Sequence, residues 1–368
     1  MSVYWNSRIK NICPYVPGEQ PGERRFIKLN TNENPYPPSP KVLEAIVKAA
    51  DERLRLYPDP ECMAFREAVA RRYKVRPSQV FAGNGSDEVL AFAFGAFFES
   101  GGPEILFPDI TYSFYPVYAD LWNVPYRTVA LDDDFLIRTG AYETPCGGAV
   151  FPNPNAPTGT AITLRDILSL AGYLEKREKI LIIDEAYAAF IPEGTGAGSA
   201  AGSIEGHPNL LTVHTLSKSA SLAGLRAGFA IGDEKLIEGL RRVRDSFNSY
   251  TMDRLALAGA EAAVQDAAYY DDVNRRVAAT RDRTAESLRG LGCTVLPSAA
   301  NFIFMKAPGP GGAEFLSALR EKGILVRHFN KDRIAGFLRV SIGTDEDMDA
   351  FLAACGEIIA GYRPASNS

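Results

Sequence analysis

Hydrophobic and polar residues alternate in blocks between about residues 80 and 232. Short apolar runs in this region predict buried strands at 104–107, 148–151, 180–184, 211–214 and 228–231. Helical patterns between some of them predict helices near 86–98, 112–121 and 163–177. Because parallel strands need crossover helices on the faces of their sheet, the alternation indicates an α/β fold with a mostly parallel sheet covered on both faces.

The two ends of the chain follow other patterns. The first 38 residues are rich in Pro, Gly and Asn and predict an extended arm, followed by helices near 40–54 and 61–73. A long helical region at 251–291 leads into a second unit, with strands near 301–305, 324–327 and 337–342 and helices near 312–322 and 345–361. We therefore predict an arm at 1–38, a large domain at 39–250 and a smaller α+β domain at 251–368.

Composition narrows the choice of partner and compartment. Of 368 residues, 46% are hydrophobic and 23% charged, and the formal charge of −5 favours neither nucleic acid nor an acidic membrane as the partner. The five cysteines form no CxxC pair and the three histidines have no metal-ligand spacing, so we expect free thiols and no metal site. No signal segment or bilayer-spanning apolar run is evident, and the cytoplasm is the expected compartment.

One lysine has an unusual setting. Lys218 follows the hydroxyl residues Thr215 and Ser217, and Arg226 comes eight positions after it. A lysine forms a Schiff base with an aldehyde cofactor, and hydroxyl groups with an arginine bind phosphate. Pyridoxal 5'-phosphate carries both groups. The alternative is a solvated lysine on a serine-rich loop, which is the commoner case, so other segments must supply the remaining cofactor contacts.

Three further motifs offer such contacts. Asp184 ends a predicted strand, where open α/β sheets bind ligands, and its carboxylate can pair with a protonated ring nitrogen. Tyr187 and Asn155 can donate to the phenolic oxygen of the ring. The glycine-rich loop at 83–88 opens a helix, whose free N–H groups make an anion site. Each motif has an ordinary alternative: a capping aspartate, a core tyrosine, a turn asparagine or a plain N-cap.

The order of these motifs, over nearly the whole chain, resembles the fold-type I pyridoxal-phosphate aminotransferases. The resemblance implies that Lys218 is the Schiff-base lysine and proton carrier, and that Asp184 holds the pyridine nitrogen. It implies that Tyr112 stacks on the ring, and that Tyr57 reaches the cofactor phosphate of the neighbouring subunit in a homodimer with shared active sites. The cofactor phosphate is expected to be bound by Gly85, Ser86, Asp87, Thr215, Ser217 and Arg226. The large domain would bind the cofactor, and the arm would join the small domain and the active site.

The chain departs from the family pattern at one position. Many relatives have an asparagine directly before the proline of the motif at 153–159, whereas this chain has Ala156 there. Asn155 is then expected to serve the phenolic oxygen together with Tyr187.

Segments near both ends resemble a narrower group, the histidinol-phosphate aminotransferases; they lie at 14–21, 29–36, 323–330 and 337–344. This resemblance implies transfer of the amino group between L-histidinol phosphate and 2-oxoglutarate, or glutamate, in L-histidine biosynthesis. Two arginines, Arg327 and Arg339, would bind phosphate or carboxylate oxygens, since a guanidinium fork accepts either; surface ion pairs are their ordinary alternative. Tyr15 and Asn34 complete the expected substrate site.

Three other functions share these motifs. An aromatic amino-acid aminotransferase would bind a carboxylate where we expect a phosphate, and a threonine-phosphate decarboxylase would bind another phosphorylated amine. A cofactor-binding regulator would need an added DNA-binding domain, for which the arm before residue 40 is too short.

Overall fold

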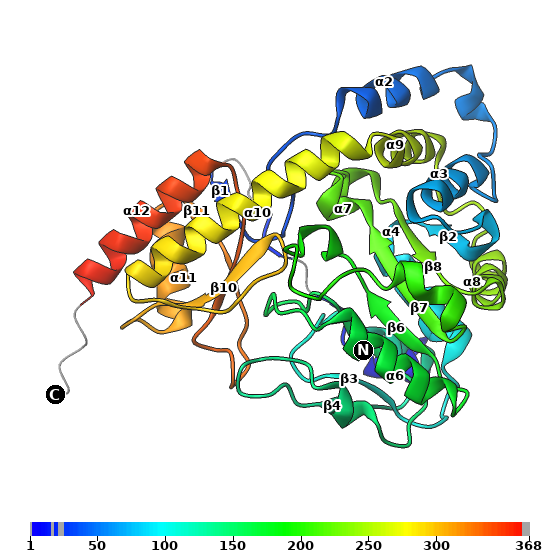
Figure 1. Cartoon of the computed structure of the whole chain (residues 1–368), viewed down its shortest axis with the longest axis horizontal. Coiled ribbons are helices and arrows are strands. Elements are labelled where there is room, and N and C mark those ends of the chain that lie inside the picture. Colours follow the sequence, from blue (N-terminus) through cyan, green and yellow to red (C-terminus); the bar gives the residue numbers. More distant parts are fainter. Residues whose placement is uncertain (1, 16–17, 21–25, 363–368) are drawn as a thin grey trace.

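The largest element of the fold is a seven-stranded sheet, found in a computed structural model that describes residues 2–15, 18–20 and 26–362 (Figure 1). Its strands are β2 (Val80–Gly83), β3 (Ile105–Pro108), β4 (Tyr126–Val129), β5 (Ala149–Pro152), β6 (Leu181–Asp184), β7 (Leu210–Thr215) and β8 (Gly228–Ile231). They lie in the order β2-β8-β7-β6-β5-β3-β4, and all pairs are parallel except those that β8 makes with β2 and β7. The predicted mostly parallel sheet is confirmed.

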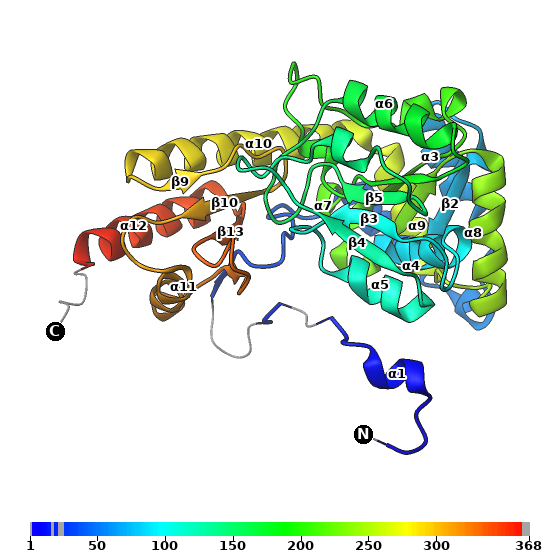
Figure 2. The ribbon, with the colours of Figure 1, turned by 90° about the horizontal axis from the view of Figure 1, so that it is seen from below.

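Central strands send alternate side chains into two cores. Val150 and Ile182 pack on one face in a core shared with α4, α5 and α8, whereas Phe151 and Ile183 pack on the other face with α6. The helices around the sheet are α3 (Met63–Tyr73), α4 (Gly85–Phe97), α5 (Phe114–Trp122), α6 (Leu164–Glu175), α8 (Glu234–Phe247) and α9 (Arg254–Gln265). Figure 2 shows α6 on one side of the strands and α4 and α5 on the other. Both faces are therefore buried, which explains the continuous apolar runs of the strands.

A smaller antiparallel sheet lies beside the large one. It consists of β9 (Thr294–Val295), β10 (Phe302–Lys306), β12 (Arg327–His328) and β13 (Leu338–Ser341), in the order β12-β13-β10-β9. Its core is closed by α10 (Ala267–Gly290), α11 (Gly312–Glu321) and α12 (Asp345–Gly361). The long helix α10 runs from the large unit to the small one (Figure 1).

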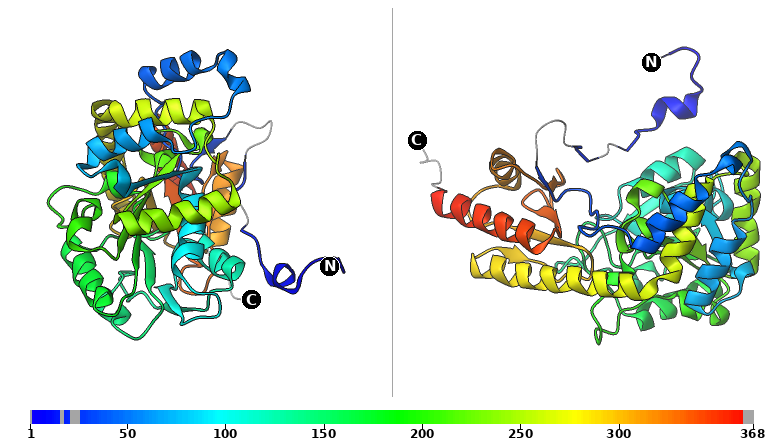
Figure 3. Two further views of the ribbon diagram at one scale, coloured as in Figure 1. Left: turned by 90° about the vertical axis from the view of Figure 1, so that its right-hand side faces the viewer. Right: turned by 90° about the horizontal axis from the view of Figure 1, so that it is seen from above.

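The N-terminal segment pairs with a short strand of the small unit before it reaches the large unit. It contains α1 (Ser7–Asn11) and β1 (Ile27–Lys28), and β1 pairs in parallel with β11 (Ile324–Leu325). Figure 3 shows α1 standing out from the body of the fold at the far end of this segment. After β1, the chain passes between the two sheets and enters α2 (Pro40–Ala49). Residues 29–34 are thereby placed between the two units.

Several predicted elements differ in the structure. The helical region at 251–291 is two helices that meet at Asp266, and the strand predicted at 324–327 is divided between β11 and β12, which belong to different sheets. Among the elements that were not predicted are β2, β4 and α8. The edge strand β4 is mostly exposed and so has no apolar run. The domain bounds at 38/39 and 250/251 stay a prediction.

The remaining helices are short. The 3-10 helices are Glu52–Arg55, Pro77–Gln79, Thr139–Tyr142, Ala188–Phe190, Ala201–Gly206 and Ala223–Leu225. Among the residues that the structure describes, no helix is long and apolar enough to cross a membrane, and no group of three potential metal ligands is found.

Candidate active site

A cavity of about 290 Å³ lies where the carboxyl ends of β5, β6 and β7 face the start of α4 and the small sheet. Parallel sheets bind ligands at this edge, because the strands end there and the following loops diverge. Most of the predicted site residues line the cavity: Tyr15, Ser86, Asp87, Tyr112, Asp184, Tyr187, Thr215, Ser217, Lys218, Arg226, Arg327 and Arg339. The fold thus brings together residues from both units and from the N-terminal segment.

Lys218 lies on α7 (Leu216–Ser219), directly after β7. The hydroxyl of Thr215 accepts from Ser217 N at 3.1 Å and so caps this short helix. Lys218 Nζ donates to Thr31 O at 2.9 Å, which holds the amine in the cavity wall. Burial, and to a smaller extent the positive charge of Arg339, lower the pKa of Lys218 to about 8. The amine is therefore neutral, and able to attack an aldehyde, at a lower pH than an exposed lysine.

Asp184 is buried at the end of β6. Its Oδ1 accepts from Ala186 N at 3.1 Å and its Oδ2 accepts from Tyr115 Oη at 3.2 Å. Burial raises the pKa of Asp184 to about 7, and the negative charge of Asp87 adds to the rise. A cationic nitrogen in the cavity would reverse this and keep the carboxylate charged. Tyr115 was not predicted as a site residue; its place in the aromatic run of α5 gave no signal beyond a core role.

The N-terminus of α4 forms a cradle for an anion. Its N-cap, Asn84, makes no side-chain cap bond, so the first N–H groups of the helix have no such acceptor. Gly85 has φ +79°, and a Cβ there would lie 2.8 Å from Arg226 Nη2. A Cβ on Gly228 would lie 2.5 Å from Ser86 N. Two glycines therefore let backbone and guanidinium approach closely, as a phosphate site requires.

Side chains complete this cradle. Arg226 Nη2 donates to Asp87 Oδ2 at 2.9 Å, and Tyr112 Oη donates to Asp87 Oδ1 at 2.6 Å. Asp87 thus orients both the guanidinium and the tyrosine ring. The hydroxyl groups of Thr215 and Ser217 lie in the same cavity. The residues present fit a phosphate group beside an aromatic ring, which is the chemistry of pyridoxal phosphate.

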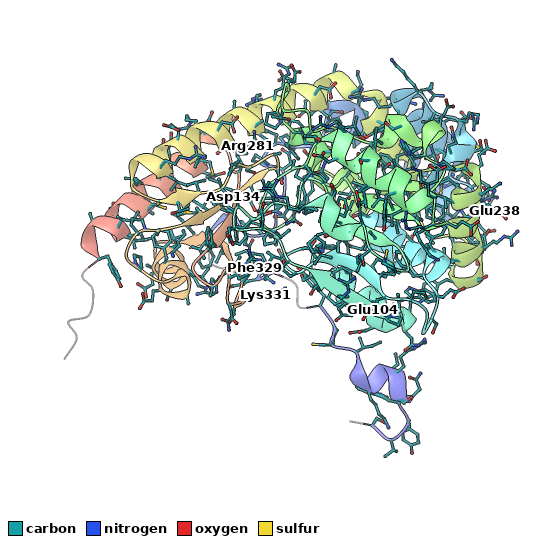
Figure 4. All side chains as sticks on the ribbon, turned by 60° about the horizontal axis from the view of Figure 1, so that its bottom comes forward. Glu104, Asp134, Glu238, Arg281, Phe329 and Lys331 are labelled. Carbon is teal, nitrogen blue, oxygen red and sulfur yellow. The ribbon has the colours of Figure 1, made fainter. Side chains whose placement is uncertain are left out.

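The side toward the small sheet is cationic and aromatic. Arg339 is partly buried, and its desolvation lowers its pKa; its Nη2 donates to Asn30 O at 3.0 Å. The guanidinium carbons of Arg339 and Arg327 lie 5.6 and 5.9 Å from the ring centre of Phe329, which is labelled in Figure 4. Tyr15 stacks on Phe114, with ring centres 4.3 Å apart. This end of the cavity suits a second anion, separate from the one at α4.

The structure does not bring Asn155, which was expected to contact the ring oxygen, to the cavity wall. Its side chain is buried outside the cavity wall, and Nδ2 donates to Ile110 O at 3.0 Å and to Thr158 Oγ1 at 2.9 Å. Both amide hydrogens are used to hold the turn after β5, so none is left for a ring oxygen. Ala156 lines the cavity instead and has no polar group to offer. The contact expected from this motif is absent among the described residues of the cavity wall.

Two other predicted residues lie beside the cavity or outside it. Asn34 Nδ2 donates to Lys218 O at 3.0 Å, so this side chain supports α7, and its contact with substrate stays a prediction. Tyr57 is 79% exposed and stacks on Tyr250 with ring centres 4.6 Å apart. It lies outside the cavity of its own chain, and its reach to a neighbouring subunit stays a prediction. Sequence reasoning also passed over Thr31 and Asn32, which line the cavity; they belong to the segment 29–36, from which only Asn34 was expected to be a site residue.

Comparison with known proteins agrees with this site. The model of the family "Aminotransferase class I and II" matches residues 24–354. The chain is 51% identical over 363 residues to histidinol-phosphate aminotransferase 1 of Bordetella parapertussis, covering 98% of this chain and 100% of that protein. It is 50% identical to the histidinol-phosphate aminotransferase of Clostridium acetobutylicum, with 98% and 100% covered.

Solved structures show the same fold. The histidinol-phosphate aminotransferase of Sinorhizobium meliloti in complex with pyridoxal-5'-phosphate superposes with a TM-score of 0.85 at 26% identity, covering 98% of both chains. The aspartate aminotransferase of Thermus thermophilus with maleate has a TM-score of 0.82 at 20% identity, covering 96% of this chain and 99% of that one. From the family match over most of its length and from relatives half identical to it, the chain belongs to the class I and II aminotransferases.

Proposed function

We propose that this protein is a pyridoxal-phosphate-dependent aminotransferase that transfers the amino group between L-histidinol phosphate and 2-oxoglutarate, a step of L-histidine biosynthesis. The observation that carries the proposal is the cavity around Lys218. It joins a partly buried amine of lowered pKa to an anion cradle at α4 and to a second cationic end at Arg327 and Arg339. Half-identical relatives of the full chain length bear the name of this activity.

Different residues of the cavity would bind different parts of the cofactor. When bound, pyridoxal phosphate supplies an aldehyde that takes up the amino group and a ring that stores an electron pair. Arg226, with Ser86 and the start of α4, would hold its phosphate, and Tyr112 would lie against its ring. Asp184 would face the ring nitrogen, because it is the carboxylate at the end of β6. Tyr187 would donate to the ring oxygen.

The chain's own groups then govern the proton. Lys218 Nζ lies in the cavity wall with its pKa lowered to about 8, so a neutral amine is available to accept the proton from Cα of a bound amine. Its hydrogen bond to Thr31 O, 2.9 Å long, holds the nitrogen in place between transfers. Asp184 and Tyr187 are also buried, so solvent water is kept away from their polar groups.

The cationic end accounts for two different substrates. Histidinol phosphate carries a phosphate but no carboxylate, whereas glutamate carries two carboxylates. The guanidinium groups of Arg327 and Arg339 can bind either kind of oxygen in a bidentate way. The hydroxyl of Tyr15, held by stacking on Phe114, supplies a further donor at this end.

A half-reaction screen tests the substrate. The loaded protein is mixed in single turnover with histidinol phosphate, histidinol, glutamate, phenylalanine or threonine phosphate, and the loss of the cofactor band is followed. We expect histidinol phosphate and glutamate to react fast. Histidinol should react about a hundredfold more slowly, because a partly buried arginine is left without its anion. A fast reaction with phenylalanine and none with histidinol phosphate would assign an aromatic aminotransferase instead. Release of carbon dioxide from threonine phosphate would assign the decarboxylase.

We also propose a cytoplasmic homodimer. All five cysteines are free thiols, which suits a reducing compartment. Large apolar side chains are exposed on one set of neighbouring elements, with Val47 75%, Tyr57 79% and Phe247 76% exposed. Such a surface is typical of an interface between subunits, and Tyr57 belongs to it. Sedimentation should give twice the chain mass of 40.0 kDa, and a stable monomer at micromolar concentration would contradict the proposal.

A further inference from the structure

A buried chain of hydrogen bonds leads from the small sheet to the cavity through Asn32. Asn32 Nδ2 donates to Tyr187 Oη at 2.9 Å. On the other side, Ser341 Oγ donates to Asn32 Oδ1 at 3.0 Å, and the backbone N of Asn32 donates to Ser341 Oγ at 2.8 Å. Asn32 and Ser341 are 1% and 2% exposed, so water does not compete for these bonds.

The direction of each bond follows from the backbone. The N–H of Asn32 can only donate, so Ser341 Oγ accepts from it and has its own hydrogen left to give. That hydrogen points to the amide atom 3.0 Å away, which must therefore be the oxygen of Asn32. The amide atom next to Tyr187 is then the nitrogen, a donor. Tyr187 Oη accepts this bond and keeps its own hydrogen for a partner in the cavity.

The direction of these hydrogen bonds decides whether Tyr187 can donate to the ring oxygen of the cofactor. The methyl side chain of Ala156 offers no donor to the cavity, and the amide of Asn155 is engaged elsewhere. Of the two side chains expected to donate to the ring oxygen, Asn155 and Tyr187, only Tyr187 then has its hydrogen available for it. We propose that Asn32 is a positioning residue that fixes the Tyr187 hydroxyl as a donor toward that oxygen, in place of the asparagine that the turn after β5 lacks. The inference rests on the proposed function, because it concerns the cofactor of that reaction.

The backbone of Asn32 limits the choice of variants. Asn32 has φ 55°, a left-handed conformation that Asn, Asp and Gly tolerate and that other residues adopt with strain. Asn32→Gly removes the amide without a charge and without backbone strain. Asn32→Asp keeps the shape but places an acceptor against Tyr187, so the tyrosine hydrogen turns away from the cavity.

The test is a pH titration of the absorbance band of bound pyridoxal phosphate in five proteins: unmodified, Asn32→Gly, Asn32→Asp, Tyr187→Phe and the double variant of Asn32→Gly with Tyr187→Phe. A donor removed from the ring oxygen leaves more negative charge beside the Lys218 nitrogen, which then holds its proton more tightly and titrates at higher pH. We expect Tyr187→Phe and Asn32→Gly each to raise the midpoint, by up to about one pH unit, and the double variant to match Tyr187→Phe alone. Asn32→Asp should raise it at least as far as Asn32→Gly.

Two controls separate the outcomes. Thermal unfolding of the cofactor-free proteins shows whether each variant is folded. If Asn32→Gly is not folded, the titrations are repeated with Asn32→Asp in its place, and Asn30→Asp serves as the control. The latter adds a similar charge to the cavity wall without touching Tyr187 in the structure. If a folded variant has an unchanged midpoint, or if its shift adds fully to that of Tyr187→Phe, the inference about Asn32 is wrong and the proposed function is not affected. An unmodified protein without a titrating cofactor band overturns the proposed function as well.

Discussion

Replacing Lys218 with alanine is expected to lower the rate of amino transfer by at least about ten-thousandfold. The variant loses both the nitrogen that binds the aldehyde and the base that moves the Cα proton. The measurement is steady-state turnover of histidinol phosphate with 2-oxoglutarate. The loss should be of kcat, because Arg327 and Arg339 remain to bind the substrate.

The pH dependence of cofactor loading belongs to the same prediction. Burial lowers the pKa of Lys218 to about 8. The fraction of Lys218 that is neutral therefore increases as the pH rises to that value and changes little above it. Covalent loading of the cofactor-free protein should therefore speed up until about pH 8 and then level off, and it should be absent from Lys218→Ala. Lys235→Ala, which alters an exposed lysine of α8, is the matched control and should leave loading and turnover unchanged. Sustained turnover by Lys218→Ala would contradict the mechanism.

The part of the site that could be predicted from sequence is the part built at strand ends. Asp184 and Thr215 terminate apolar strands, and a parallel sheet brings such ends to one edge whatever the rest of the fold does. Lys218 and Arg226 follow Thr215 closely along the chain. Local order was therefore enough to place these residues in one cavity.

Contacts between distant segments could not be predicted in this way. Asn32 and Tyr187 are 155 positions apart, and their bond depends on how the N-terminal segment passes between the two sheets. Asn155 was expected in the cavity wall and is not found there, for a related reason. A motif gives the residue type but not the direction of the side chain, and here the amide is consumed by its own turn. The helix α8 was missed although Ile237 and Leu240 have helical spacing, because charged residues surround them.

Replacing Asp184 with asparagine is expected to weaken cofactor binding and to slow amino transfer by about a hundred- to a thousandfold. The carboxylate is buried, and burial is the main cause that raises its pKa to about 7, so a positive partner is needed to keep it fully charged. The protonated ring nitrogen is that partner. A neutral amide of the same shape keeps the contact with Ala186 N but cannot balance the charge, so the ring nitrogen loses its proton and the ring holds electrons less well.

A matched control lies next to it on the chain. Glu185 is also a buried carboxylate with a pKa raised to about 7 by burial, but it accepts from Ala200 N at 2.6 Å and is absent from the cavity wall. Glu185→Gln therefore makes the same chemical change one residue away, outside the site. Equilibrium titration with pyridoxal phosphate and single-turnover rates should separate the two variants. If both lose equally, the effect of position 184 is that of any buried charge and Asp184 does not face the ring nitrogen. If only Asp184→Asn loses affinity and rate, its charge acts on the cofactor directly.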